Sequence, residues 1–152
     1  MTHEHFLIDD LYVGWQRTVT RRITEADLHA TIQLTGDQGG YHVDEGWAQT
    51  VGFHTVITPG LLQAGMVTRI GGELNYLAKE ITFRYLKPVY VGDTLRATMT
   101  VTEVDRDRNR IALAGEVTNQ HGEVVLACDT HGYLPRAEWG KPAKPPPVDH
   151  PT

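Results

Sequence analysis

An aspartate and a histidine lie five residues apart in a glycine-containing stretch that carries side chains suited to acid–base chemistry. They are Asp37 and His42, within the sequence GDQGGYHVD of residues 36–44. Because glycine adopts backbone conformations closed to other residues, an irregular connection here could bring the carboxylate and the imidazole into one small volume. Such a pair could hold a water molecule, with the carboxylate taking one proton and the imidazole positioning or delivering another. The alternative is ordinary local hydrogen bonding beside a turn and a helix cap.

A second candidate is a glycine at the expected start of an apolar helix. Thr58-Pro59 is typical of a helix cap followed by a first helical residue, and Gly71-Gly72 predicts the end of the helix. The first N–H groups of a helix have no intrahelical partner and carry partial positive charge. Gly60 has no side chain, so a ligand oxygen could approach its N–H closely; one such donor to a developing enolate oxygen contributes about 2.7–4 kcal/mol. Close packing of another group is the alternative role.

The elements that position these groups fall in two halves of the chain, and the spacing of the apolar residues differs between the halves. Between residues 24 and 72 the apolar residues recur with the helical period, whereas between 77 and 134 they alternate with polar residues. This change of period predicts an α+β domain. The helix that begins near Gly60 is apolar around most of its circumference, so we expect it to be buried. Its small residues would allow a sheet to curl around it.

The shorter helices have clear start signals. Thr24 and Asp27 can form a capping box, which predicts a first helix over residues 24–35. Asp44 is placed to cap a short helix over residues 44–50.

About five strands are expected to form an antiparallel sheet. An early strand falls near residues 12–21, and the others lie within residues 77–134. Turn sequences around Gly92, Asn109 and Gly122 separate the later strands, so successive strands can pair as hairpins.

Length and composition indicate one globular domain. The chain has 152 residues, and we expect a lead-in over 1–10, a domain over 11–136 and a proline-rich tail over 137–152. Its 14 Lys+Arg against 19 Asp+Glu give a net charge of -5, which argues against a nucleic-acid partner.

The cysteine count and the apolar runs exclude further classes. The single cysteine, Cys128, leaves no intrachain disulfide and no thiolate metal cluster, and no metal-binding constellation is apparent. No apolar run approaches the roughly 20 residues of a membrane-spanning helix. The first residues lack the basic and apolar regions of a secretion signal, so we expect a cytoplasmic protein without a membrane partner.

Three stretches of the chain resemble the MaoC-like dehydratase family, which includes the (R)-specific enoyl-CoA hydratases. They read TVTRRITEADLHATIQLTGDQGGYHVDEGWAQTVGFHTVITPGLLQAGM, ITFRYLKPVYVGDTLRATMTVTEV and EVTNQHGEVVLACDTHGYLPR, and they cover nearly all of the chain outside its two ends. The resemblance implies a single hotdog domain, in which an antiparallel sheet of about five strands wraps around a long central helix. It also implies a homodimer or higher homo-oligomer formed by pairing of sheets.

The resemblance also implies a reaction, the syn hydration of a trans-2-enoyl thioester to the (R)-3-hydroxyacyl thioester, or its reverse. The family motif is Gly-Asp-x-Asn-Pro-x-His-x-Asp, and Asp37 and His42 match its two catalytic positions. Asp37 would orient and deprotonate the water that attacks C3, and His42 would share that water and help to protonate C2. Gly60 matches the glycine whose N–H binds the thioester oxygen.

Three further residues are candidates for substrate binding. Thr68 matches a hydroxyl residue that supports the site in many family members. Tyr41 could line the acyl pocket, with a place in the core or an interface as its alternative. Arg84, with Lys87, could meet the phosphates of coenzyme A, although exposed basic residues on a strand are commonly only solvated. The implied partner is an acyl-CoA or acyl-carrier thioester, with no cofactor and no metal.

The chain departs from the family motif at two places. Gly39-Gly40 stands where the family usually has Asn-Pro, and Pro59 stands where a histidine usually precedes the glycine. A non-catalytic or weakly active acyl-thioester-binding subunit is therefore an alternative to a hydratase. A hotdog thioesterase is another, but residues 60–70 contain neither Asp nor Glu to serve as its helix carboxylate.

Overall fold

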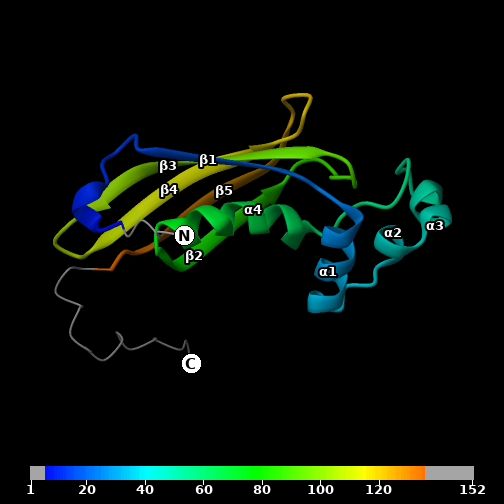
Figure 1. The fold of residues 1–152 in the computed structure, drawn as a ribbon, viewed down its shortest axis with the longest axis horizontal. Coiled ribbons are helices and arrows are strands. Elements are labelled where there is room, and N and C mark those ends of the chain that lie inside the picture. The colour runs from blue at the N-terminus through cyan, green and yellow to red at the C-terminus, as the bar shows by residue number, and fades with distance from the viewer. Residues whose placement is uncertain (1–5, 136–152) are drawn as a thin grey trace.

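A computed structural model describes residues 6–135, and these form an α+β fold built on one five-stranded antiparallel sheet (Figure 1). The strands are β1 (Gln16–Arg22), β2 (Leu77–Tyr85), β3 (Thr94–Asp105), β4 (Arg110–Thr118) and β5 (Val124–Tyr133). The predicted fold class and strand number are confirmed. Residues 1–5 of the expected lead-in and the tail 137–152 lie outside the described residues, so the domain boundaries stay a prediction.

The sheet has the order β1-β3-β4-β5-β2. β3, β4 and β5 form two consecutive hairpins, whose turns contain Asn109 and Gly122 at φ 54° and 75°. β2 and β3 follow one another in the chain but are not neighbours, because β2 pairs with β5 and β3 pairs with β1. The prediction that all successive strands pair was therefore wrong at Gly92. That turn instead bonds to Ile23 at the end of β1, where the Gly92 N–H donates to the Ile23 carbonyl over 2.8 Å.

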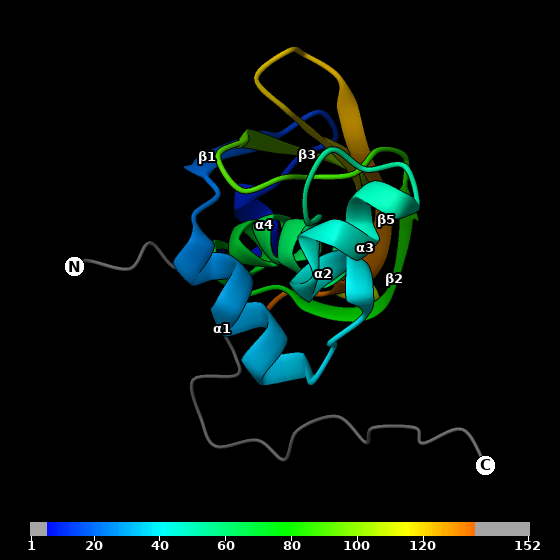
Figure 2. The same cartoon turned by 90° about the vertical axis from the view of Figure 1, so that its right-hand side faces the viewer.

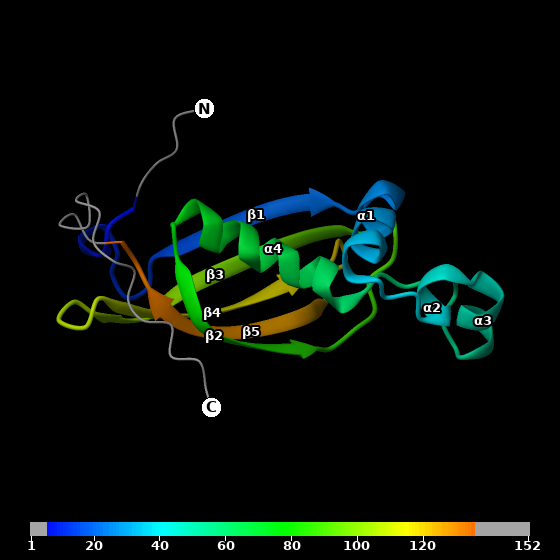
Figure 3. The same cartoon turned by 90° about the horizontal axis from the view of Figure 1, so that it is seen from below.

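The central helix α4 (Gly60–Glu73) lies across the concave face of the sheet (Figures 2 and 3). Met66, Val67 and Ile70 point into the core and are at most 6% exposed. Leu61, on another face of the helix, is 60% exposed, so the expected burial is correct for one side of the helix only. A sheet that wraps around a long helix in this way is the hotdog arrangement that the family resemblance implies.

Three short helical segments lie outside the sheet and the central helix. They are η1 (Ile8–Asp10), α2 (Gly40–Val43) and α3 (Glu45–Thr50). Ile8, from the expected lead-in, is buried in the core. α2 and α3 project beyond one end of the sheet (Figures 1 and 3). No helix among residues 6–135 combines the length and the apolar character needed to cross a membrane.

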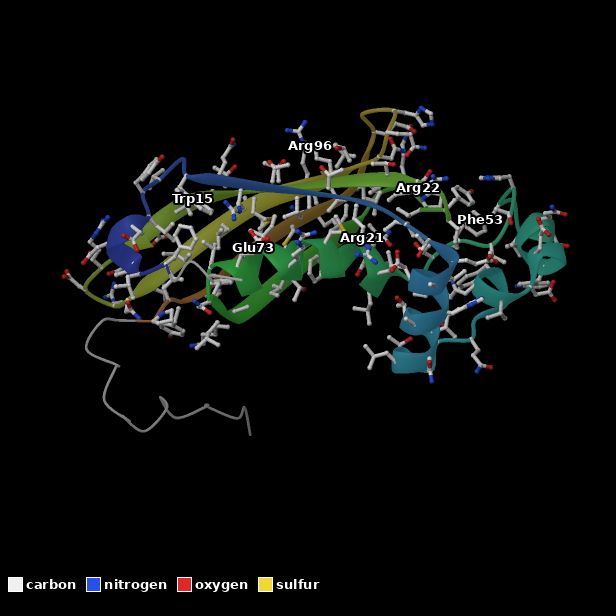
Figure 4. The ribbon with its side chains drawn as sticks, viewed as in Figure 1. Trp15, Arg21, Arg22, Phe53, Glu73 and Arg96 are labelled. Atoms are coloured by element: carbon white, nitrogen blue, oxygen red, sulfur yellow. The ribbon has the colours of Figure 1, made fainter. Side chains whose placement is uncertain are left out.

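The helix α1 (Glu25–Thr35) begins with the predicted capping box. The Thr24 N–H donates to Asp27 Oδ2 over 3.0 Å, and the Asp27 N–H donates to Thr24 Oγ1 over 3.2 Å. Arg21, at the end of β1 (Figure 4), donates to Asp27 Oδ1 over 2.5 Å. This hydrogen bond holds the pKa of Asp27 below its ordinary value, against the opposing effect of partial burial. One carboxylate thus joins the end of β1 to the start of α1.

We expect Asp27→Ala to lower the free energy of unfolding at pH 7 by about 1 kcal/mol, because it removes a helix cap and an ion pair together. The folded-state pKa of Asp27 is depressed, so its contribution is complete above the unfolded-state value and is lost as the pH falls through the folded-state value. Urea unfolding at pH 7 and in acid measures the difference. Glu25→Ala, in the same helical turn, is the control, and an equal loss at both pH values would contradict the assignment.

Candidate active site

A cleft of about 770 Å³ opens at the amino end of α4. It is lined by the loop that follows α1, by α2, by the chain that leads into α4 and by the end of β2. Four of the candidate residues line this one cleft: Asp37, Tyr41, His42 and Gly60. Phe53, from the loop after α3, lines it as well and lies on the side of the projecting lobe (Figure 4).

His42 is carried by α2, a single helical turn where the sequence predicts an irregular connection. Gly39 precedes the turn, and its carbonyl accepts from the His42 N–H over 2.8 Å. A Cβ on Gly40 would occupy the space of the Trp47 indole ring, so this glycine allows α2 to pack closely on α3. α3 itself begins as predicted, with Asp44 Oδ1 accepting from the Trp47 N–H over 3.0 Å. Close packing against Trp47, rather than flexibility of the loop, therefore explains why a glycine is needed at position 40.

Two hydrogen bonds fasten α2 to Ile57, and we call this pair the Ile57 clamp. The Ile57 N–H donates to the Tyr41 carbonyl over 2.9 Å, and the Nδ1 of His42 donates to the Ile57 carbonyl over 2.7 Å. The next residue, Thr58, donates its N–H to the Val89 carbonyl over 2.8 Å. Because Ile57 precedes Gly60 by only three residues, the clamp holds the imidazole beside the amino end of α4.

Asp37 and His42 lie next to each other at the wall of the cleft. Asp37 Oδ2 lies 3.3 Å from His42 Nε2; the histidine is 6% exposed, whereas the aspartate side chain is 48% exposed. The other carboxylate oxygen accepts from the Gly39 N–H over 3.2 Å. A carbonyl only accepts, so Ile57 fixes a proton on Nδ1 and leaves Nε2 as an acceptor in the neutral ring. One water molecule can therefore donate one O–H to the carboxylate and the other to the imidazole.

The helix α4 begins at Gly60, with Pro59 as its N-cap, one residue later than the sequence predicts. The ring of Tyr85 packs against this glycine. A Cβ on Gly60 would lie 2.7 Å from Cε1 and 3.2 Å from the hydroxyl of Tyr85. Partial desolvation raises the pKa of Tyr85, so its phenol is neutral and able to donate at physiological pH. The Gly60 N–H and the Tyr85 hydroxyl thus border the same part of the cleft.

A buried polar pair that the sequence analysis does not predict forms part of the cleft wall. Gln63 appears in the sequence only as an interruption of an apolar helix, yet it is 3% exposed. Thr58 is 4% exposed, and its hydroxyl lies 3.4 Å from Gln63 Oε1, to which it donates. The one available signal was spacing, because Gln63 follows Gly60 by three residues and so shares its helix face.

Two predicted substrate-binding residues lie outside this cleft. Thr68 is exposed on α4, donates to the Ala64 carbonyl over 3.3 Å, and borders a separate cavity of about 220 Å³ beside the later part of the helix. Arg84 does not line the cleft and pairs with Asp129 over 2.6 Å. Lys87 does line it and pairs with Glu123.

Neither a metal site nor a helix carboxylate is found at the cleft. Within residues 6–135, no three His, Cys, Asp or Glu side chains lie close enough together to hold a metal ion. The observed α4 extends to Glu73, which the predicted helix did not include. Glu73 lies at the end of α4 remote from the cleft (Figure 4) and pairs with Arg17 over 2.7 Å and Arg69 over 3.5 Å.

The fold and the cleft define a hotdog protein with an aspartate–histidine pair at the amino end of its central helix. Residues 14–124 match the family model described as "MaoC like domain", and the chain belongs to this family. It is 33% identical over 133 residues to the (R)-specific enoyl-CoA hydratase of Rhodospirillum rubrum, covering 84% of this chain and 90% of that protein. It is 29% identical over 140 residues to the 3-hydroxybutyryl-CoA dehydratase of Methylorubrum extorquens, covering 88% and 87%.

A solved structure shows the same fold. The (R)-hydratase from A. caviae involved in PHA biosynthesis superposes with a TM-score of 0.76 at 26% identity, and the match covers 82% of this chain and 98% of that one.

We expect Gly40→Ala to lower the free energy of unfolding by about 1–3 kcal/mol, because the added methyl group displaces the Trp47 ring from α2. In a Trp47→Ala background the same substitution should be almost neutral. Urea unfolding of the four proteins in this double-mutant cycle measures the coupling. Gly46→Ala is the control, since its Cβ would make an ordinary contact of 3.4 Å with Asp44. Equal costs in both backgrounds would contradict the packing role.

Proposed function

We propose that this protein hydrates a trans-2-enoyl-CoA thioester to the (R)-3-hydroxyacyl-CoA, or catalyses the reverse dehydration. The observation that carries the proposal is the pair of facing acceptors, Asp37 Oδ2 and His42 Nε2, in the cleft that Gly60 also lines. The named relatives, an enoyl-CoA hydratase and a 3-hydroxybutyryl-CoA dehydratase, support the same substrate class. The cytoplasmic location predicted from the sequence is part of the proposal.

In the hydration direction, a water in the cleft that donates to both Asp37 and His42 attacks C3 of the enoyl group. The carboxylate of Asp37 accepts one proton as the water oxygen forms its bond to C3. Asp37 is suited to this role because its half-exposed side chain lines the cleft, while the Gly39 N–H orients Oδ1. His42 holds the second O–H, and the Ile57 clamp fixes the orientation of its ring.

The electron pair of the C2–C3 double bond moves onto the thioester oxygen and forms an enolate. The Gly60 N–H, at the positive end of the α4 dipole, stabilises this oxygen. Collapse of the enolate takes a proton at C2 from the Asp37–His42 pair, so the pair returns the proton it received and the net reaction adds one water. Both bonds form from the side of the substrate that faces the pair, which makes the addition syn.

Of the predicted substrate-binding residues, we propose that Tyr41 contacts the acyl group directly, since it lines the cleft. Thr68 and Arg84 lie outside the cleft of their own chain, so no direct contact is proposed for them there.

Asp37→Asn should lower kcat for hydration of an enoyl-CoA by about 10²–10⁴-fold, the usual contribution of a general base, with the fold intact. Loss of the ultraviolet absorbance of the enoyl thioester measures the rate, and chiral analysis of the product tests for the (R) form. Asp9→Asn is the control, because Asp9 lies in η1 at the opposite end of the molecule from α2 (Figure 1). Full activity of Asp37→Asn would refute the assigned role. Release of free thiol would indicate a thioesterase, and binding without turnover a non-catalytic subunit.

We also infer that a second copy of the chain pairs with β2. This strand forms one edge of the sheet, and nearly all of its residues are exposed. Exposed apolar side chains gather along this edge and on the adjoining helix face: Leu61, Leu77, Ile81, Tyr85 and Leu86. An open edge that carries apolar side chains is a template for pairing with another strand. Pairing of two β2 strands would join the two sheets, as the family resemblance implies.

Ile81→Glu should convert a dimer to a monomer, because a twofold axis brings two like charges together on the apolar edge. Sedimentation velocity measures the change in mass. Leu34→Glu is the control: Leu34 is 88% exposed on α1, away from β2, so the same substitution there should leave the mass unchanged. A wild-type monomer, or a dimer that survives Ile81→Glu, would contradict this interface.

A further inference from the structure

The buried amide of Gln63 has donors that the protein does not use. Its Oε1 accepts from Thr58, but its Nε2 makes no hydrogen bond to any residue between 6 and 135. Gln63 is 97% buried and nevertheless borders the cleft, so this NH₂ group is open to a ligand there and to little else. Since the oxygen of this amide is turned toward Thr58, its two N–H donors are the groups without a protein partner.

The amide borders the same cleft as the reacting groups of the proposed mechanism. Helical side chains point back toward the amino end of their helix, and the contact with Thr58 shows that Gln63 does so. Thr58 directly follows Ile57, whose carbonyl binds His42. The donors of Gln63 therefore border the part of the cleft near the acid–base pair, and not the cavity beside the later part of α4.

A buried donor discriminates between acyl groups. An alkyl chain packed against it would displace water and leave the N–H groups without an acceptor, which is costly. An acyl group with an oxygen atom at the right place would satisfy them. Two more donors line the same cleft, since the hydroxyls of Tyr41 and Tyr85 make no hydrogen bond within the described residues. A surface of this kind favours an oxygen-bearing ligand over a hydrocarbon.

We propose that Gln63 is a specificity-determining residue that selects acyl thioesters with a hydroxyl, ether or carboxylate oxygen a few atoms from the reacting double bond, in preference to alkyl thioesters of equal length. As a statement about turnover this inference rests on the proposed hydratase function. As a statement about binding it does not, and the experiment uses that difference.

Isothermal titration with two pairs of saturated thioesters tests the proposal on the full-length protein. Each pair has the same number of acyl atoms: 4-hydroxybutanoyl-CoA with pentanoyl-CoA, and 5-hydroxypentanoyl-CoA with hexanoyl-CoA. In at least one pair, the wild type should bind the hydroxyacyl thioester about tenfold or more tightly. Gln63→Met, which keeps the size of the side chain and removes its donors, should reduce this preference to about twofold or less by weakening only the hydroxyacyl member.

Two further variants separate the role of the donors from that of packing. Gln63→Glu keeps the shape of the side chain but replaces the NH₂ donors with an acceptor, so it should abolish a preference for 4-methoxybutanoyl-CoA over hexanoyl-CoA, because an ether oxygen only accepts. Gln33→Met, on the exposed surface of α1 and outside the cleft, should leave both affinities unchanged. Circular dichroism confirms that each variant is folded.

The outcomes distinguish failure of the inference from failure of the hydratase. Equal affinity within both pairs, or tighter binding of the alkyl members, overturns the inference. Equal weakening of both members by Gln63→Met overturns it as well, and indicates that Gln63 donates to the thioester oxygen. The corresponding 2-enoyl thioesters then test turnover: preference in binding without hydration refutes only the hydratase, whereas hydration with equal efficiency in each pair refutes only the inference.

Discussion

The Ile57 clamp is the constraint on which the rest of the site depends. A four-residue helix such as α2 has too few internal hydrogen bonds to be stable alone. Ile57 supplies the missing order, because its N–H holds Tyr41 and its carbonyl holds the ring of His42. The same contact selects the ring tautomer, so Nε2 is left to accept. Position and tautomer of the imidazole are thus set by one backbone group, three residues before the helix whose amino end completes the cleft.

The features that the sequence predicts correctly are those decided by neighbours in the chain. Thr24 and Asp27 are three residues apart, and Asp44 caps the helix that follows it, so local hydrogen bonding alone determines them. The strand alternation is equally local. The family motif adds the meeting of Asp37 and His42 in one cleft, which spacing alone leaves open.

The features that the sequence does not predict are decided by packing between distant segments. Turn residues at Gly92 mark where a strand ends but not which edge of the sheet the next strand joins. Gln63 is polar, and only the arrival of Thr58 and the cleft wall explains its burial. The rings of Trp47 and Tyr85 occupy the space that side chains at Gly40 and Gly60 would need. Neither contact can be predicted from the residues next to these glycines in the chain.

Because α2 and α3 project beyond the sheet, we expect them to unfold at a lower temperature than the rest of the domain. This lobe contributes Ala48 and His42 as buried residues, whereas the main core lies between α4 and the sheet. Segments with few buried contacts open at a lower free energy than the core around which a domain is built. His42 sits in such a segment, so on heating its contacts with Asp37 and Ile57 would be lost before the sheet structure, and on cooling they would return as fast as α2 and α3 fold back.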